Sequence, residues 1–184
     1  MLMIMENPLA TAPFTQTQAT LTKPVDVRRG QGEAQAEFEL GLKFANAGGS
    51  QNVAQAILHF LNAADQNHVR AQVNLSIMYA QGRGVRRNQA QCLQWLSKAA
   101  TLGDAEAQYT LGMMQNRISM DQERQAEGEL RIEAYKWLRL AAAQAYPNAQ
   151  TGCDFVSLGM TRESVIEGSR RAAAFAPRDR ASAR

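Results

Sequence analysis

From about residue 34, small and apolar residues recur at spacings of three and four positions, the period of one face of an α-helix. No segment alternates between apolar and polar residues as a half-buried strand does. A first pattern, Ala-x-x-x-Leu followed by a small residue, begins at Ala36, Ala71 and Ala107. A second pattern follows each copy of the first. It has a small residue, then His or Trp three positions later, then two alanines, and it begins at Ala56, Cys92 and Ala134. The chain therefore predicts a series of helix–loop–helix units.

A degenerate fourth copy of the first pattern begins at Ala149. The first alanines of the four successive copies are separated by 35, 36 and 42 residues. Repetition at such periods is typical of stacked helical repeats, in which each unit buries its apolar face against its neighbours. The longest period contains an insertion near residues 117–128, which is either a binding loop or a segment without a role in binding. The carboxylates of Glu127, Glu129 and Glu133 are interpreted as solvated charges.

Small residues at the repeated alanine positions indicate that neighbouring helices approach closely, and Trp95 and Trp137 are expected to fill the space between units. Gly103 suits a left-handed helix C-cap, and Asp104 can accept hydrogen bonds from the free amides of the next helix. We expect further helix ends at Asn67-His68 and at Tyr146-Pro147, with the proline in the first helical turn, and we expect second helices to be capped by Asn52 and Asn88.

The 184 residues are 45% hydrophobic, which suits one domain with flexible ends or a short repeat array. The net charge of +3 comes from the ends, because residues 31–150 hold 11 basic and 11 acidic side chains. Without a stripe of Lys and Arg interleaved with aromatic residues, we expect no nucleic-acid partner. No apolar run approaches the ~20 residues that span a bilayer, and the apolar residues 1–5 lack a basic flank. We therefore expect a cytoplasmic protein without membrane insertion, and a secreted or periplasmic location is the alternative.

Residues with catalytic or metal-binding chemistry are few and scattered. His59 stands at the tryptophan position of the first unit, and His68 stands at a helix end. Cys92 occupies a small-residue position and Cys153 replaces a leucine, so the four residues lack the close spacing of a zinc site. Residues 82–87 lack the Gly-Lys-Ser/Thr ending and the preceding strand of a phosphate-binding loop. The sequence therefore predicts no catalytic residue, no metal and no cofactor, and we expect no enzyme.

Together these patterns resemble the Sel1-like repeat family, relatives of the tetratricopeptide repeats. The family motif runs Ala-x-x-x-Leu-Gly-x-x-Tyr, then Gly-x-Gly-Val, then Ala-x-x-Trp-x-x-Lys-Ala-Ala-x-x-Gly. The resemblance covers roughly residues 34–155, although the third unit departs from the motif in the loop and the first lacks the Gly-x-Gly and the Trp. Residues 161–177 also resemble the short helix ending in Phe-x-Pro that often closes bacterial members. The second unit matches the motif at Ala71, Leu75, Tyr79, Gly82-Arg83-Gly84-Val85, Trp95, Lys98-Ala99-Ala100 and Gly103.

The resemblance implies a right-handed α-solenoid of antiparallel helix pairs, with three repeats, a partial fourth and a C-terminal closing helix. We expect the solenoid to occupy residues 31–158, with units at about 34–68, 69–104, 105–146 and 147–158. The other expected segments are a disordered N-terminal segment at 1–30, a closing helix at 159–177 and a basic disordered tail at 178–184.

The resemblance also implies a non-catalytic adaptor or scaffold that binds a peptide or helix of a partner protein through the concave face of the array. The positions two residues on either side of the repeated leucine would line that face, and they are apolar in all three units, so they form either a groove or ordinary core. The arginines of the loop after Gly82 are candidates for contact with an acidic partner. The alternatives are a regulatory or inhibitory subunit of an enzyme complex and a secreted effector that binds a foreign protein. The candidate partner-binding residues are Phe38, Leu42, Val73, Ile77, Tyr109, Met113, Arg83, Arg86 and Arg87.

Overall fold

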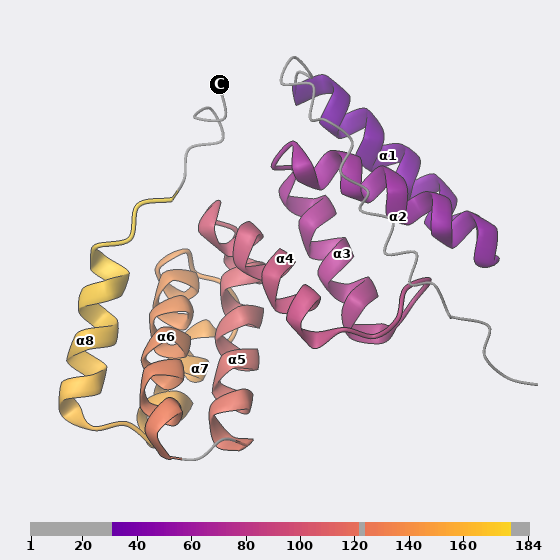
Figure 1. Cartoon of the computed structure of the whole chain (residues 1–184). Coiled ribbons are helices and arrows are strands. Elements are labelled where there is room, and N and C mark those ends of the chain that lie inside the picture. Colours follow the sequence, from indigo (N-terminus) through magenta and orange to yellow (C-terminus); the bar gives the residue numbers. More distant parts are fainter. Residues whose placement is uncertain (1–30, 122–123, 178–184) are drawn as a thin grey trace, which may run out of the picture.

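The structure, a computed structural model, describes residues 31–121 and 124–177, and all of their regular structure is helical (Figure 1). The predicted all-α class is confirmed. The segments 1–30 and 178–184, which we expected to be disordered, lie outside the described residues. The helices are α1 (Gln31–Ala47), α2 (Ser50–Asp65), α3 (Val69–Gln81), α4 (Gln89–Thr101), α5 (Ala105–Asp121), α6 (Arg124–Ala143), α7 (Ala149–Ser157) and α8 (Arg162–Ala173).

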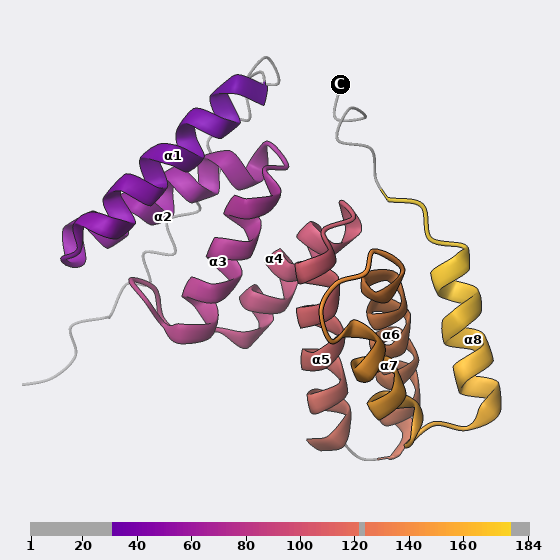
Figure 2. The same cartoon turned by 180° about the vertical axis from the view of Figure 1, so that it is seen from behind.

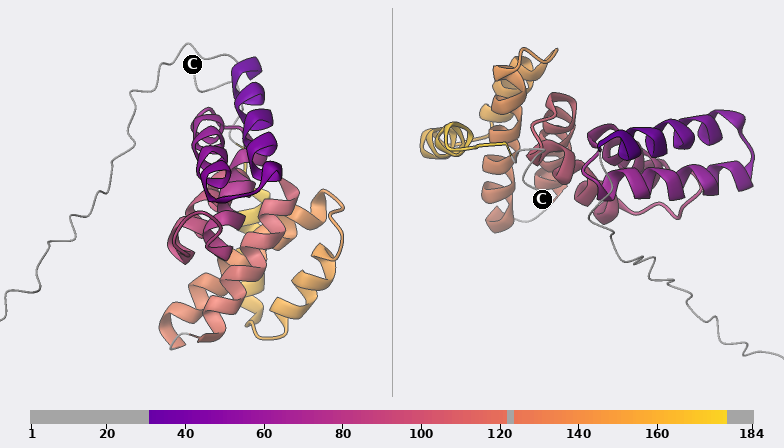
Figure 3. Two further views of the ribbon diagram at one scale, coloured as in Figure 1. Left: turned by 90° about the vertical axis from the view of Figure 1, so that its right-hand side faces the viewer. Right: turned by 90° about the horizontal axis from the view of Figure 1, so that it is seen from above.

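Consecutive helices form three antiparallel pairs, α1–α2, α3–α4 and α5–α6, and each pair packs on the next (Figures 1 and 2). Seen from above, the pairs follow one another in a row that begins with α1 and α2 and ends with α6, α7 and α8 (Figure 3). Trp95 packs in a buried cluster with Phe60 of the first unit, and Trp137 packs in a second cluster with Leu96 of the second unit. The expectation that the tryptophans fill the space between units is confirmed.

The repeated small residues lie where helices approach most closely. Ala64, Ala71, Ala100 and Ala107 are between 0% and 2% exposed. Gly112 of α5 faces α6 so closely that a Cβ atom there would lie 2.8 Å from the backbone oxygen of Ala134. A larger side chain at these positions would separate the helices, so the small residues set the spacing of the array.

Two buried glutamines join neighbouring units. Gln72 and Gln108 each follow the first alanine of their unit and are 0% and 1% exposed. Gln72 Nε2 donates a hydrogen bond to the backbone oxygen of Ala64 at 3.0 Å, and Gln108 Nε2 donates to that of Ala100 at 3.1 Å. Gln108 Oε1 also accepts a bond from Gln144 Nε2 at 2.9 Å, whereas Gln72 Oε1 has no partner among the described residues.

Most of the predicted helix ends are confirmed. The side chains of His68, Asn88 and Asp104 accept hydrogen bonds from the first-turn amides of α3, α4 and α5. Gly103 has the positive φ of 88° that a left-handed position after a helix requires.

Two of the predicted helix ends are wrong. α2 begins at Ser50, and the Asn52 side chain, already inside the helix, donates back to the Gly48 carbonyl at 2.6 Å. Pro147 precedes α7 rather than joining its first turn, because Asn148 adopts a left-handed conformation and the helix begins at Ala149.

The insertion near residues 117–128 lengthens two helices. α5 has 17 residues and α6 has 20, whereas the equivalent helices α3 and α4 have 13 each. Residues 122 and 123 between them lie outside the described part of the chain. Most of the inserted residues therefore make the α5–α6 pair longer than the α3–α4 pair.

The C-terminal end of the array differs from the other units. α8 packs mainly along α6 rather than along α7 (Figures 2 and 3). The position of α7 that corresponds to Gly112 is Asp154, an exposed acidic residue, and Gln150 Nε2 donates to Asp154 Oδ1 at 2.9 Å. A polar residue at this position does not suit close helix pairing. α7 therefore has an exposed polar residue where α5 packs closely against its second helix, α6.

A charged cluster attaches α8 to α6. The guanidinium of Arg171 contacts the carboxylates of Glu129, Glu133 and Glu167, the last two at 2.8 Å. The interpretation of Glu133 as a solvated charge is therefore wrong, whereas the Glu129 side chain is 62% exposed and remains a surface charge beside Arg171. The Glu127 side chain lies outside the described residues. After α8, Phe175 packs edge-on against Trp137, with ring centroids 5.4 Å apart.

Candidate functional site

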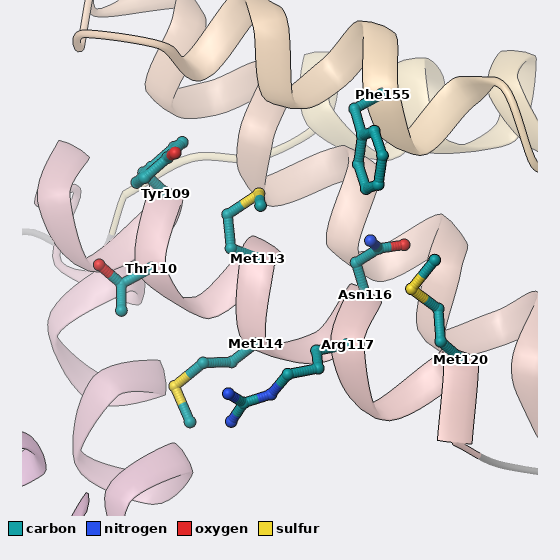
Figure 4. A pocket seen from close by; sticks show the side chains of 8 residues that line it. All are labelled: Tyr109, Thr110, Met113, Met114, Asn116, Arg117, Met120 and Phe155. Carbon is teal, nitrogen blue, oxygen red and sulfur yellow. The ribbon is translucent and has the colours of Figure 1, made fainter.

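A groove lies between α5 and α7, the first helix of the third unit and that of the partial fourth (Figure 4). Its cavity has a volume of about 410 Å³, and a second cavity of about 220 Å³ adjoins it near the end of α7. The two cavities share Asn116, Met120 and Phe155. We call the first cavity the α5–α7 groove, and it is lined by Tyr109, Thr110, Met113, Met114, Asn116, Arg117, Met120 and Phe155.

The repeat pattern places several of these residues. Phe155 stands six positions after Ala149, as Met113 stands six positions after the first alanine of the third unit. Met120 lies in the lengthened end of α5, beyond the repeat pattern. Both helices turn these side chains toward one cavity, so an aromatic ring from the fourth unit faces thioethers from the third (Figure 4).

The groove is apolar and partly open. Phe155 is 51% exposed and Met120 is 60% exposed. Tyr109 and Met113 are half-buried, because they also pack against the cluster formed by α6 and α7. The ring centroids of Tyr109 and Tyr146 lie 5.3 Å apart, and this contact fixes the position of Tyr109 at one end of the groove. The groove thus combines a packed floor with exposed rims.

The charges around the groove are basic. Arg117 is exposed and lines the groove, and Arg131 lines the adjoining cavity, where its Nη1 donates to the Gly159 carbonyl at 2.6 Å. No aspartate or glutamate is among the described residues that line either cavity. Arg117 also lies close enough to Cys92 to oppose the effect of burial, which raises the pKa of that thiol.

The structure places the nine candidate residues in different environments. Tyr109 and Met113 line the groove. Ile77 is 43% exposed on α3, while Leu42 and Val73 are half-buried and pack against the first and second core clusters.

Phe38 belongs to the core instead of an open surface. Its side chain is 1% exposed. The His68 ring stacks on it at 4.5 Å, and the Arg70 guanidinium lies 5.2 Å from its centroid. A partner would have to displace both side chains to reach the Phe38 ring, so Phe38 is not part of an open binding surface.

The candidate arginines lie on the loop between α3 and α4, away from the groove. Arg83, Arg86 and Arg87 are exposed, and Arg83 Nη2 donates to the Ala45 carbonyl at 2.9 Å. This bond ties the loop to the end of α1. A role for Arg86 and Arg87 in partner binding stays a prediction.

Sequence reasoning missed the other six lining residues, which are Thr110, Met114, Asn116, Arg117, Met120 and Phe155. A signal existed for Phe155, because the degenerate fourth copy begins at Ala149 and the same six-residue step leads to it. For Met120 the repeat pattern offered no signal, since the residue belongs to the insertion.

Within the described ranges, no group of three or more His, Cys, Asp or Glu side chains could hold a metal ion. Both cysteines are buried and unpaired, and burial raises the pKa of Cys153 to about 11. A thiol with such a pKa is a poor nucleophile near neutral pH. None of the helices in residues 31–121 and 124–177 combines the length and the apolar character that crossing a membrane requires.

Comparison with known proteins identifies the repeats. The Sel1 repeat family matches residues 34–68, 69–104 and 131–146. A Sel1 repeat protein from Oxalobacter formigenes is 32% identical, with a TM-score of 0.57 over 67% of this chain and 90% of that one. A protective antigen of uropathogenic Escherichia coli strains, which displays an SLR fold, is 24% identical with a TM-score of 0.66.

The match to the antigen covers 79% of this chain but only 30% of the antigen, so this chain spans less than a third of that protein. No curated protein sequence matches the chain. The repeat matches and the similarity to the Oxalobacter formigenes protein along nearly its whole length agree with the stacked helix pairs described above. The chain therefore belongs to the Sel1 repeat family.

Proposed function

We propose that this protein is a non-catalytic adaptor that binds a segment of a partner protein through the α5–α7 groove. Sel1 repeat proteins generally mediate protein–protein interactions, and the family is typically non-catalytic. One observation carries the choice of site: Met120 and Phe155, from different units, border one cavity and are each more than half exposed. Exposed apolar residues gathered at a groove are typical of interaction sites.

The energetics support a contact wider than the groove. Fully burying a Met or Phe side chain contributes ~1.5–3 kcal/mol, so covering the exposed halves of Met120 and Phe155 contributes about 2–3 kcal/mol in total. Association costs at least ~4 kcal/mol in lost freedom. A partner must therefore bury additional surface, and Ile77 and Leu42, at the same repeat position as Met113, are the proposed extension along the first helices.

Methionines suit such a site physically. Met113, Met114 and Met120 are unbranched and flexible, so they adapt to partners of different shape. The half-buried Tyr109 supplies a rigid wall beside them. Adaptable apolar side chains on a helical floor suit recognition of an apolar peptide surface.

Capture from a lysate with the full chain tests this proposal. The groove variant Met120→Glu/Phe155→Glu is compared with wild type and with the control Leu58→Glu/Ile166→Glu, whose residues are 38% and 59% exposed on α2 and α8. Circular dichroism and thermal melting establish that all three are folded.

We expect at least one protein to bind wild type and the control but not the groove variant, and the purified pair to titrate with a defined stoichiometry. If every captured protein binds the groove variant as well as wild type, the groove is not the binding site.

A further inference from the structure

We infer that the occupant of the α5–α7 groove is a short amphipathic α-helix that carries an acidic side chain facing Arg117. The inference rests on the proposed function and specifies the chemistry of the partner. Three observations lead to it: the apolar lining, the spacing of the lining residues along α5, and the charge of the groove.

The lining favours a helix over an extended peptide. Most of the groove wall consists of Tyr109, Met113, Met114, Met120 and Phe155, which offer few hydrogen-bonding groups. The helical backbones behind them are satisfied internally, and the described residues contain no strand edge. The other lining side chains, Thr110, Asn116 and Arg117, could pair with only a few amides of an extended peptide, and the remaining amides would be buried against this wall without partners. A helix satisfies its own backbone and presents only side chains.

The spacing of the lining residues sets the length of the occupant. Tyr109, Met113, Arg117 and Met120 follow one face of α5 over three turns. At 1.5 Å per residue, the stretch from Tyr109 to Met120 spans ~16 Å. A partner helix of about eleven residues covers this length, and Phe155 contacts it from the opposite wall. Its apolar side chains would recur at positions i, i+3 or i+4, and i+7.

The charge of the groove selects an acidic partner. No carboxylate of the described residues forms an ion pair with Arg117, although the chain forms ion pairs elsewhere, as between Lys136 and Glu133 at 2.7 Å. Its guanidinium can donate two parallel hydrogen bonds to one carboxylate. Because Arg117 lies at an open rim, this contact governs which partner binds more than how tightly it binds.

Selection of peptides on the purified full chain tests the inference. The probe is a phage-displayed library of random peptides of about 16 residues, long enough for four helical turns. Selections are run in parallel on wild type, on Arg117→Glu and on Arg139→Glu, which makes the same charge change at an exposed position of α6 that lines neither cavity. A fourth selection on Met120→Glu/Phe155→Glu identifies the peptides that depend on the groove.

We expect wild type and Arg139→Glu to enrich groove-dependent peptides with helical apolar periodicity and one or more acidic residues. Arg117→Glu should enrich peptides with Lys or Arg instead, and it should weaken binding of an acidic peptide about tenfold or more, with recovery when the peptide's acid is replaced by Lys. Circular dichroism should show that the peptides become helical on binding.

Groove-dependent peptides that are extended, or that keep their acidic residue on Arg117→Glu, would overturn the inference and leave the proposed function standing. The absence of any groove-dependent peptide would overturn both.

Discussion

The two glutamines that join neighbouring units make a matched pair for testing how the array is held together. Gln72 and Gln108 are equally buried and donate equivalent hydrogen bonds. They differ on the acceptor side, because Gln108 Oε1 receives a bond from Gln144, whereas the residue in the place of Gln144 beside Gln72 is Leu102, which cannot donate. We predict that Gln108→Leu and Gln72→Leu have different effects on stability.

The expected free energies follow from the bonds removed. The carbonyls of Ala64 and Ala100 each keep a backbone donor, so neither substitution leaves an unsatisfied backbone oxygen. Gln108→Leu removes two hydrogen bonds of ~1 kcal/mol each, and exposed Gln144 regains water, so the net loss is about 1–2 kcal/mol. Gln72→Leu removes one such bond but also an unpaired buried oxygen that costs ~1–3 kcal/mol, so it is neutral or stabilising.

Urea unfolding followed by far-ultraviolet circular dichroism measures both variants against wild type. The difference between them should be about 1–4 kcal/mol, and each kcal/mol corresponds to ~2–4 °C in melting temperature for a chain of this size. Equal destabilisation by the two substitutions, or a larger loss for Gln72→Leu, would refute the hydrogen-bond pattern described here.

Three further predictions follow. Gly112→Ala should cost ~1–3 kcal/mol in thermal or urea unfolding, because its methyl group would press on the Ala134 carbonyl; a neutral result would contradict the close approach of α5 and α6. Hydrogen bonds from Arg170 and Arg171 hold the pKa of Glu167 at about 2, below its ordinary value of 4.5. The stability that this carboxylate contributes is therefore present above pH 4.5 and is lost as the pH falls toward 2. Glu167→Gln should remove this part of the acid sensitivity of the melting temperature, and an unchanged pH profile would argue against the pairing. Cys153, with a pKa of about 11, should react with iodoacetamide near pH 8 about 100-fold or more slowly than in the urea-unfolded chain; comparable rates would show that its helix is open.

Much of the fold could be predicted from the sequence because repetition makes each local signal appear several times. The spacing of alanines gave the helix pairs, and the polar residues between them gave three of the capping interactions, at His68, Asn88 and Asp104. Asn52 failed as a cap because Gly48 and Gly49 adopt positive φ values and let α2 begin earlier.

The first unit shows what repetition alone does not predict. Ala71 and Leu75 are fully buried, but their counterparts Ala36 and Leu40 are exposed, the latter at 41%, because no described helix precedes α1. Phe38 is buried because His68 and Arg70, at the start of the next unit, cover its ring. Burial at a repeat position thus depends on neighbours that the repeat pattern does not specify.

Contacts between segments that lie far apart in the chain could not be predicted from the sequence either. Arg171 reaches Glu129 and Glu133 across 42 and 38 positions, and their spacing within α6 carries no sign of α8. The α5–α7 groove was predicted in part, since Tyr109 and Met113 were candidates. Met120 joins it only because the insertion extends α5 past the regular end of its unit.

Site-specific photo-crosslinking tests the central claim, that partners bind in the α5–α7 groove, most directly. A photoreactive residue is placed at position 155 in the groove, and in a second chain at position 58 on the outer helix α2. We predict that a bound partner crosslinks from position 155 and not from position 58, and that Arg117→Glu reduces the yield. Crosslinking from position 58 alone, or to the same extent from both positions, would contradict the account.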